Sequence, residues 1–173
     1  LLADRADGQS RMAEARPALG DVAGAEAALD RALELQPTWV PALVNLADLR
    51  RATGRDAEGG ELLARALALA PDSADALVAR ALWLVRQGRR EAAVPLLARA
   101  SALEPAAPER AYLHAVALSS TGRPEDALDV LDAALALRPD AASLAQLAAG
   151  IARDLGDEAR AVRYLARPGA PEP

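Results

Sequence analysis

The sequence predicts an all-α protein built from five helical hairpins that stack on one another. Ala and Leu dominate its 173 residues, whereas aromatic residues make up only 2% and Phe is absent. Ala and Leu are strong helix formers, while a β-sheet would need the β-branched and aromatic residues that are scarce here. Two further observations, a series of glycines and a series of prolines that both recur every 34 residues, set the length of each hairpin.

The recurring glycines mark the turn inside each predicted hairpin, because glycine tolerates the positive φ angle that often follows a helix C-terminus. They are Gly20, Gly54, Gly88, Gly122 and Gly156. The prolines lie where the second helix of a hairpin should end, since proline cannot continue the helical hydrogen-bond ladder. They are Pro37, Pro71, Pro105 and Pro139. This register predicts about ten helices in one domain over 1–167, followed by a frayed tail at 168–173. The expected hairpins are about 6–39, 40–73, 74–107, 108–141 and 142–167.

Small and apolar residues recur in the same register. Five residues after each glycine stand Ala25, Gly59, Ala93, Ala127 and Ala161. Nine residues after it stand Leu29, Leu63, Leu97, Leu131 and Leu165. These columns share one helix face, so the small residues would let two helices touch while the Leu fills the contact. A single hairpin cannot bury its apolar faces alone, so neighbouring hairpins must stack.

The two ends depart from the repeat. Pro17 should stop the first helix of the first hairpin early. In the fifth hairpin, Ala145, Ala148 and Ala152 stand where other hairpins carry larger residues. These departures are compatible with terminal caps of the stack, and also with loosely packed ends.

A 34-residue period with two helices per unit resembles the tetratricopeptide repeat family. The matching residues run from about Ala6 to Leu165. The resemblance implies a right-handed α-solenoid whose first helices line a concave groove that binds a protein or peptide. The segments 40–51 and 109–118 also resemble the repeat region of bacterial multihaem cytochrome-associated proteins, which implies the alternative of an accessory domain in a larger haem or redox protein.

The family groove maps onto residues of the first helices. They are Val44, Asp48, Arg51, Asp75, Val78, Leu82, Arg86, Glu109, Tyr112 and Val116. The apolar members form a predicted exposed stripe, and exposed apolar area of this kind usually marks a partner site. We expect its centre at Val78, Leu82 and Tyr112, the alternative being that Tyr112 is buried between hairpins. The charged members would also complement the helix dipoles, which needs no partner.

No set of residues suggests catalysis, so the sequence predicts a protein that is not an enzyme and binds no cofactor or metal. The absence of Cys excludes thiolate zinc sites and thiol chemistry. His114 is the only histidine and is expected to pack among helices, as are Trp39 and Trp83. The Arg50–Arg51 pair is expected to be a solvated helix end.

Charge and hydropathy narrow the partners. The net charge of −5 argues against nucleic acid, because phosphate binding needs a basic surface. No apolar run is long enough to span a membrane, so we expect no membrane insertion. All basic residues are Arg, which is typical of a GC-rich bacterial genome, but the choice between cytoplasm and periplasm stays open. Assembly with copies of itself is the alternative to a protein or peptide partner.

Overall fold

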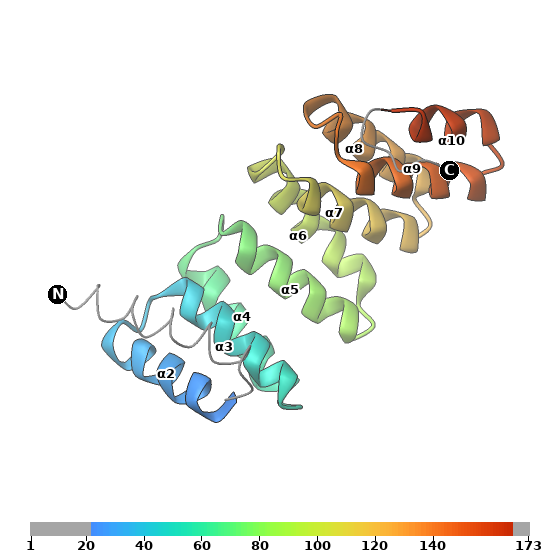
Figure 1. The fold of residues 1–173 in the computed structure, drawn as a ribbon. Coiled ribbons are helices and arrows are strands. Elements are labelled where there is room, and N and C mark those ends of the chain that lie inside the picture. Colours follow the sequence, from blue (N-terminus) through green and yellow to red (C-terminus); the bar gives the residue numbers. More distant parts are fainter. Residues whose placement is uncertain (1–21, 168–173) are drawn as a thin grey trace. The chain divides into compact units, whose positions relative to one another are not determined.

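The computed structural model describes residues 22–167, and every regular element in that range is a helix (Figure 1). The helices are α2 (Val22–Leu35), α3 (Val40–Ala52), α4 (Asp56–Leu69), α5 (Ala74–Arg86), α6 (Arg90–Leu103), α7 (Pro108–Ser120), α8 (Pro124–Leu137), α9 (Ala142–Asp154) and α10 (Glu158–Leu165). The predicted all-α fold is therefore confirmed. The expected first helix of the first hairpin, with Gly20 and Pro17, lies outside the described residues.

The chain divides into two compact units, residues 1–83 and 84–173, and the division falls inside α5. In the first unit, α3 packs against α2 and α4. In the second unit, α7 packs against α6, α8 and α9, while α9 packs against α8 and α10. These contacts join helices that are close in sequence, as the stacking of repeats requires. A single domain over 1–167 stays a prediction.

The turn glycines adopt the conformation that the sequence predicts. Gly54, Gly88, Gly122 and Gly156 have φ angles between 74° and 81°. At Gly54 the N–H donates to the Arg51 carbonyl (3.0 Å), and the next N–H, of Arg55, donates to the Arg50 carbonyl (2.7 Å). The other three glycines carry the same two bonds, which satisfy carbonyls at the end of each first helix.

The recurring prolines end the second helices, as predicted. The helices α2, α4, α6 and α8 each end two residues before their proline. The residue that precedes a proline is pushed away from helical angles, and the proline has no N–H to donate.

The predicted columns form the core. Ala25, Ala93, Ala127 and Ala161 are fully buried, and Leu29, Leu63, Leu97 and Leu131 are nearly so, while Leu165 on the last helix is half-buried. Gly59 differs from the alanines of its column, because a Cβ there would lie 2.8 Å from the carbonyl oxygen of Ala47. The α3 and α4 backbones are thus too close for a methyl group at this point.

The fifth hairpin is a packed element. Ala145, Ala148 and Ala152 on α9 are all buried, so the small side chains at these positions belong to a close-packed interface. The alternative of a loosely packed end is wrong for this helix.

Candidate functional site

The predicted groove residues are divided between the two units. The first unit contains six of them: Val44, Asp48 and Arg51 on α3, and Asp75, Val78 and Leu82 on α5. The second unit contains Arg86, at the end of α5, and Glu109, Tyr112 and Val116 on α7. Each group is therefore considered within its own unit.

In the first unit the predicted apolar stripe is only partly exposed. Leu82 is 38% exposed, but Val78 is only 7% exposed. Val44 is half-buried and packs against the core cluster of Leu43, Ala66 and Ala76. The expectation that Val78 is part of an exposed stripe is therefore wrong. Three successive residues of α5, Ala76, Leu77 and Val78, are all buried, so the first turns of this helix expose no apolar side chain on the predicted groove face.

The charged groove residues follow the helix dipoles. Asp75 and Glu109 lie in the first turns of α5 and α7, and Arg51 and Arg86 lie in the last turns of α3 and α5. Arg51 pairs with Asp48 at 2.8 Å on the exposed surface of α3. An exposed pair of this kind contributes about 0–1 kcal/mol. Local helix stabilisation explains these charges without a partner.

In the second unit, α7 presents a small apolar ridge to solvent. Tyr112 and Val116 are each 39% exposed and lie one helical turn apart. The alternative that Tyr112 is buried between hairpins is thus wrong. One repeat further on, the equivalent positions on α9 are Gln146 and Gly150. No atom lies within 4 Å of where a Cβ would stand on Gly150, so the neighbouring helix leaves an open space there.

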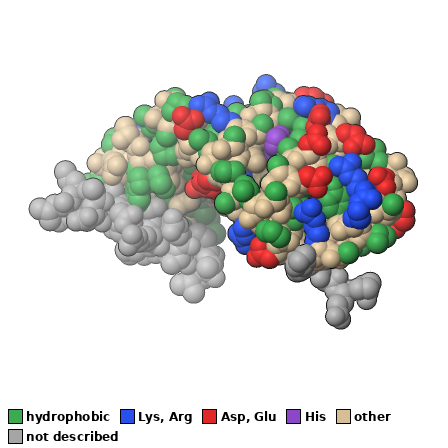
Figure 2. Space-filling model, turned by 90° about the horizontal axis from the view of Figure 1, so that it is seen from above, with side chains coloured by type: hydrophobic (Ala, Val, Ile, Leu, Met, Phe, Trp, Pro, Cys, Tyr) green, Lys and Arg blue, Asp and Glu red, His purple; other side chains and the backbone are tan. Residues whose placement is uncertain are grey.

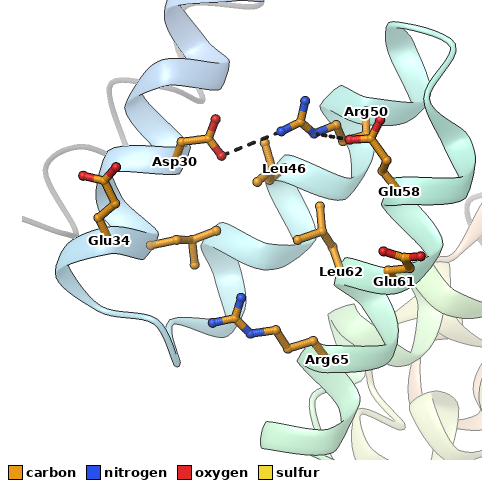
Figure 3. A pocket seen from close by; sticks show the side chains of 9 residues that line it. Asp30, Glu34, Leu46, Arg50, Glu58, Glu61, Leu62 and Arg65 are labelled. Carbon is orange, nitrogen blue, oxygen red and sulfur yellow. Dashed lines mark ion pairs between the residues drawn. The ribbon is translucent and has the colours of Figure 1, made fainter.

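The structure also shows a hollow that the sequence reasoning missed, because that reasoning considered only first helices. We call it the acidic groove (Figure 3). It has a volume of about 690 Å³ and lies between α2 and α4, above α3. Its lining residues are Asp30, Leu33, Glu34, Leu46, Arg50, Glu58, Glu61, Leu62 and Arg65. The signal in the sequence was the repeated acidic residues on the outer face of two second helices.

Arg50 lies at one end of the acidic groove and is not a solvated helix end, contrary to expectation. Its side chain is 14% exposed and pairs with Glu26, with Asp30 (3.8 Å) and with Glu58 (3.5 Å). Arg55 also donates to both carboxylate oxygens of Glu26, at 2.8 and 2.5 Å. The hydrogen bonds from Arg55 and the charge of Arg50 lower the pKa of Glu26 below its ordinary value, although burial opposes them.

A second hollow, of about 530 Å³, lies between α6, α7 and α8 in the second unit. His114 is half-buried in its wall, as expected, with Arg123 and Asp126 at the rim. Burial, and secondarily the charge of Arg123, lower the pKa of His114. An imidazole in this setting is neutral at pH 7, which suits a packing role.

Both tryptophans pack as predicted. Trp39 lies against the core cluster of α2 and α3. The Trp83 indole N–H donates to the Asp56 carbonyl at 2.8 Å, and its ring lies beneath the Arg80 guanidinium, 4.1 Å from the ring centroid.

Within 22–167, no three His, Asp or Glu side chains are grouped so that they could hold a metal ion. None of the described helices is both long and apolar enough to cross a membrane. On the face shown in Figure 2, acidic and basic side chains are interspersed with apolar ones.

Helical hairpins with glycine turns at a fixed period define an α-helical repeat protein. Family models described as tetratricopeptide repeat match residues 10–74 and residues 84–151. The chain belongs to the tetratricopeptide repeat family. Proteins of this family are generally non-catalytic interaction scaffolds, and this chain is a protein-interaction scaffold with protein or peptide partners.

Solved structures with this fold include MamA and YrrB. One MamA structure is 26% identical, with a TM-score of 0.70, and the match covers 91% of this chain and 88% of that one. Another is 21% identical, with a TM-score of 0.75, over 94% and 88% of the two chains. YrrB, described as a TPR protein with an unusual peptide-binding site, is 20% identical, with a TM-score of 0.70, over 91% and 81%. A comparison with curated protein sequences found no match. The resemblance to multihaem cytochrome-associated proteins finds no support in these matches and stays a hypothesis.

Proposed function

We propose that this protein binds a segment of a partner through the exposed face of the first helices α7 and α9 in the second unit, with Tyr112 and Val116 at the centre of the site. The observation that carries the proposal is the exposure of these two apolar side chains on one face of α7. A large apolar body with a polar hydroxyl makes Tyr a frequent hot spot in interfaces. The peptide-binding site named for YrrB, which shares the fold, supports a peptide as the partner.

The open space over Gly150 gives this face its shape. Val116 stands one repeat before Gly150, and α7 packs beside α9. A partner's apolar side chain could enter the space that the missing side chain leaves, while adjacent residues of the partner cover Tyr112 and Val116. An extended segment or an amphipathic helix would both present such a side chain. Glu109, one turn before Tyr112, would influence orientation more than affinity.

The first step of the test is to identify the partner by photo-crosslinking from position 146, which is exposed on α9. Affinity for the purified partner is then measured by calorimetry. Tyr112→Ala should weaken binding by about 2 kcal/mol, or roughly 30-fold. Gly150→Leu should also weaken it, because the new side chain fills the open space without altering Tyr112.

Two controls separate binding from folding. Tyr112→Phe should bind nearly as well as the parent, since it keeps the aromatic body. Thermal melts of the two Tyr112 variants should match the parent, because that side chain is exposed, and Gly150→Leu should melt no lower than the parent, because leucine favours the helix more than glycine does. Unchanged affinity of both Tyr112→Ala and Gly150→Leu would refute the proposal. A crosslink only to a second copy of this chain would favour homo-oligomeric assembly instead.

A further inference from the structure

We propose that the acidic groove is a second docking site, which takes a cationic amphipathic segment of a protein partner, with Arg or Lys beside apolar residues. The groove lies between the second helices α2 and α4 of the first unit. It is therefore distinct from the first-helix face of the proposed function, and it does not depend on that proposal.

The floor of the groove is apolar. Leu33, Leu46 and Leu62 line it, and Leu33 and Leu62 are only partly buried although they pack against the core clusters. The volume of about 690 Å³ is within the range of pockets that enclose ligands. A ligand that fills this hollow must bring apolar groups to cover the leucines, which a small polycation cannot do.

The rim carries an excess of negative charge. Asp30 from α2 lies across the floor from Glu58 and Glu61 of α4, whereas Glu34 lies on the side of α2 away from α4, as Figure 3 shows. Glu34 pairs with Arg31 outside the groove, at 2.6 Å. Within residues 22–167, no hydrogen bond or ion pair engages the Glu61 carboxylate.

The two arginines of the groove are already engaged by the protein. Arg50 is shared among Glu26, Asp30 and Glu58. Arg65 donates to the Pro37 carbonyl. Arg50 lies 3.8 Å from Asp30 and is shared with two other carboxylates, so it compensates the charge of Asp30 only in part. An incoming cation would be attracted by the remaining charge, whereas an acidic segment or a nucleic acid would be repelled.

In the second unit, the place between the second helices α8 and α10 is equivalent to the acidic groove between α2 and α4; we call such a place a seam. Here the chain itself supplies the cation. Asp132 on α8 stands three repeats after Asp30, and Arg160 on α10 stands three repeats after Glu58. Arg160 pairs with Glu125 (3.1 Å) and Asp132 (3.3 Å). Tyr164, three repeats after Leu62, is 4% exposed and its hydroxyl donates to Asp132 at 3.0 Å. Where the chain itself supplies a ligand for this position, that ligand is an aromatic ring with a guanidinium beside it.

The test measures binding of labelled peptides to the full chain by fluorescence anisotropy. The probe is a Leu/Arg peptide of about 14 residues, long enough to form a helix on binding. One matched peptide replaces Arg with Glu, and another replaces Leu with Ser. Only the Leu/Arg peptide should bind, and added salt should weaken it because the rim is exposed.

The decisive variant is Glu61→Arg, which reverses the unengaged charge at the rim and should reduce affinity at least about tenfold. Asp48→Arg makes the same charge change in the same unit but on the first-helix face, and should leave the affinity within about twofold of the parent. Thermal melts check that both variants fold. Tyr112→Ala should not affect this peptide, so failure here is distinguishable from failure of the proposed function.

Three outcomes would overturn the assignment. They are no binding of the Leu/Arg peptide, equal loss of binding in Asp48→Arg, and full binding by Glu61→Arg. A fourth concerns the occupant: if the parent is oligomeric by light scattering and Glu61→Arg is monomeric, the groove holds a second copy of this chain rather than a segment of another protein.

Discussion

Two glycines inside helices should respond in opposite ways to the same substitution. Gly60 lies in α4 of the first unit, and Gly150 lies in α9 of the second. A Cβ on Gly60 would stand 2.5 Å from Cε2 and 2.6 Å from Cζ2 of Trp83. A Cβ on Gly150 would meet no atom within 4 Å. We expect Gly60→Ala to destabilise the protein and Gly150→Ala to stabilise it.

The magnitudes follow from the contacts of Trp83. Alanine in a helix interior is favoured over glycine by roughly 1 kcal/mol, and Gly150→Ala should gain this amount in full. At Gly60 the ring must move by about 1 Å to restore carbon–carbon contact, and overpacking of this kind costs roughly 1–3 kcal/mol. The movement also strains the 2.8 Å hydrogen bond to Asp56 and the stacking of Arg80, each of which contributes about 1 kcal/mol. The net destabilisation should be roughly 2–4 kcal/mol.

Urea unfolding followed by far-ultraviolet circular dichroism and tryptophan fluorescence would measure both effects. Trp39 and Trp83 both lie in the first unit, so fluorescence reports on the unit that contains Gly60. The circular dichroism of Gly150→Ala should show a higher midpoint with unchanged fluorescence of the native state. If Gly60→Ala proved as stable as Gly150→Ala, the packing of Trp83 on α4 would be refuted.

Two further predictions concern the second unit. Leu97→Ala should destabilise by roughly 2–5 kcal/mol, since it opens a cavity in a buried interface, and Leu165→Ala should cost less because Leu165 is only half-buried; equal shifts in melting temperature would count against this. The lowered pKa of His114 means that the unfolded chain takes up a proton near pH 6.5 before the folded chain does. Stability should therefore be constant above that pH and decline as the pH falls below it, and His114→Gln should lack this decline. Identical pH profiles of the two proteins would contradict the burial of the imidazole.

The repeat made the turns and the core predictable. A residue that recurs every 34 positions has the same physical task each time, so Gly54 predicts the turn at Gly122 and Leu63 predicts the packing of Leu131. Periodicity cannot predict a structural environment that occurs at only one position of the register. Helix α5 buries Ala76, Leu77 and Val78 in succession, so it is covered on more than one face. A rule that assigns the same exposed face to every first helix therefore wrongly predicts that Val78 is exposed.

The environment of Arg50 was unpredictable for a related reason. Its carboxylate partners, Glu26 on α2 and Glu58 on α4, lie on helices before and after its own. The charge of Arg50 recurs only at Arg16, that of Glu58 recurs only at Asp126, and that of Glu26 recurs nowhere in the register. Only the packing of α3 between α2 and α4 brings the three side chains together. The sequence pattern of a helix end gave Arg50 the appearance of an exposed residue.

The seams between neighbouring second helices differ in the charge and polarity of the side chains that line them. The equivalent of Asp30 is Ala98 in the seam of α6 and α8, and Asp132 in that of α8 and α10. The equivalents of Glu58 are Asp126 and Arg160. The seam of α2 and α4 is acidic over a leucine floor. That of α6 and α8 combines Glu91, Asp126 and Asp129 with a half-buried imidazole, and that of α8 and α10 is closed by an internal guanidinium and a buried tyrosine. The backbone register is the same in all three, because the turn glycines and the buried leucines recur and the small-residue column carries only Ala or Gly. The residues that differ among these three places are those that face the hollow, whereas the residues that join the helices recur.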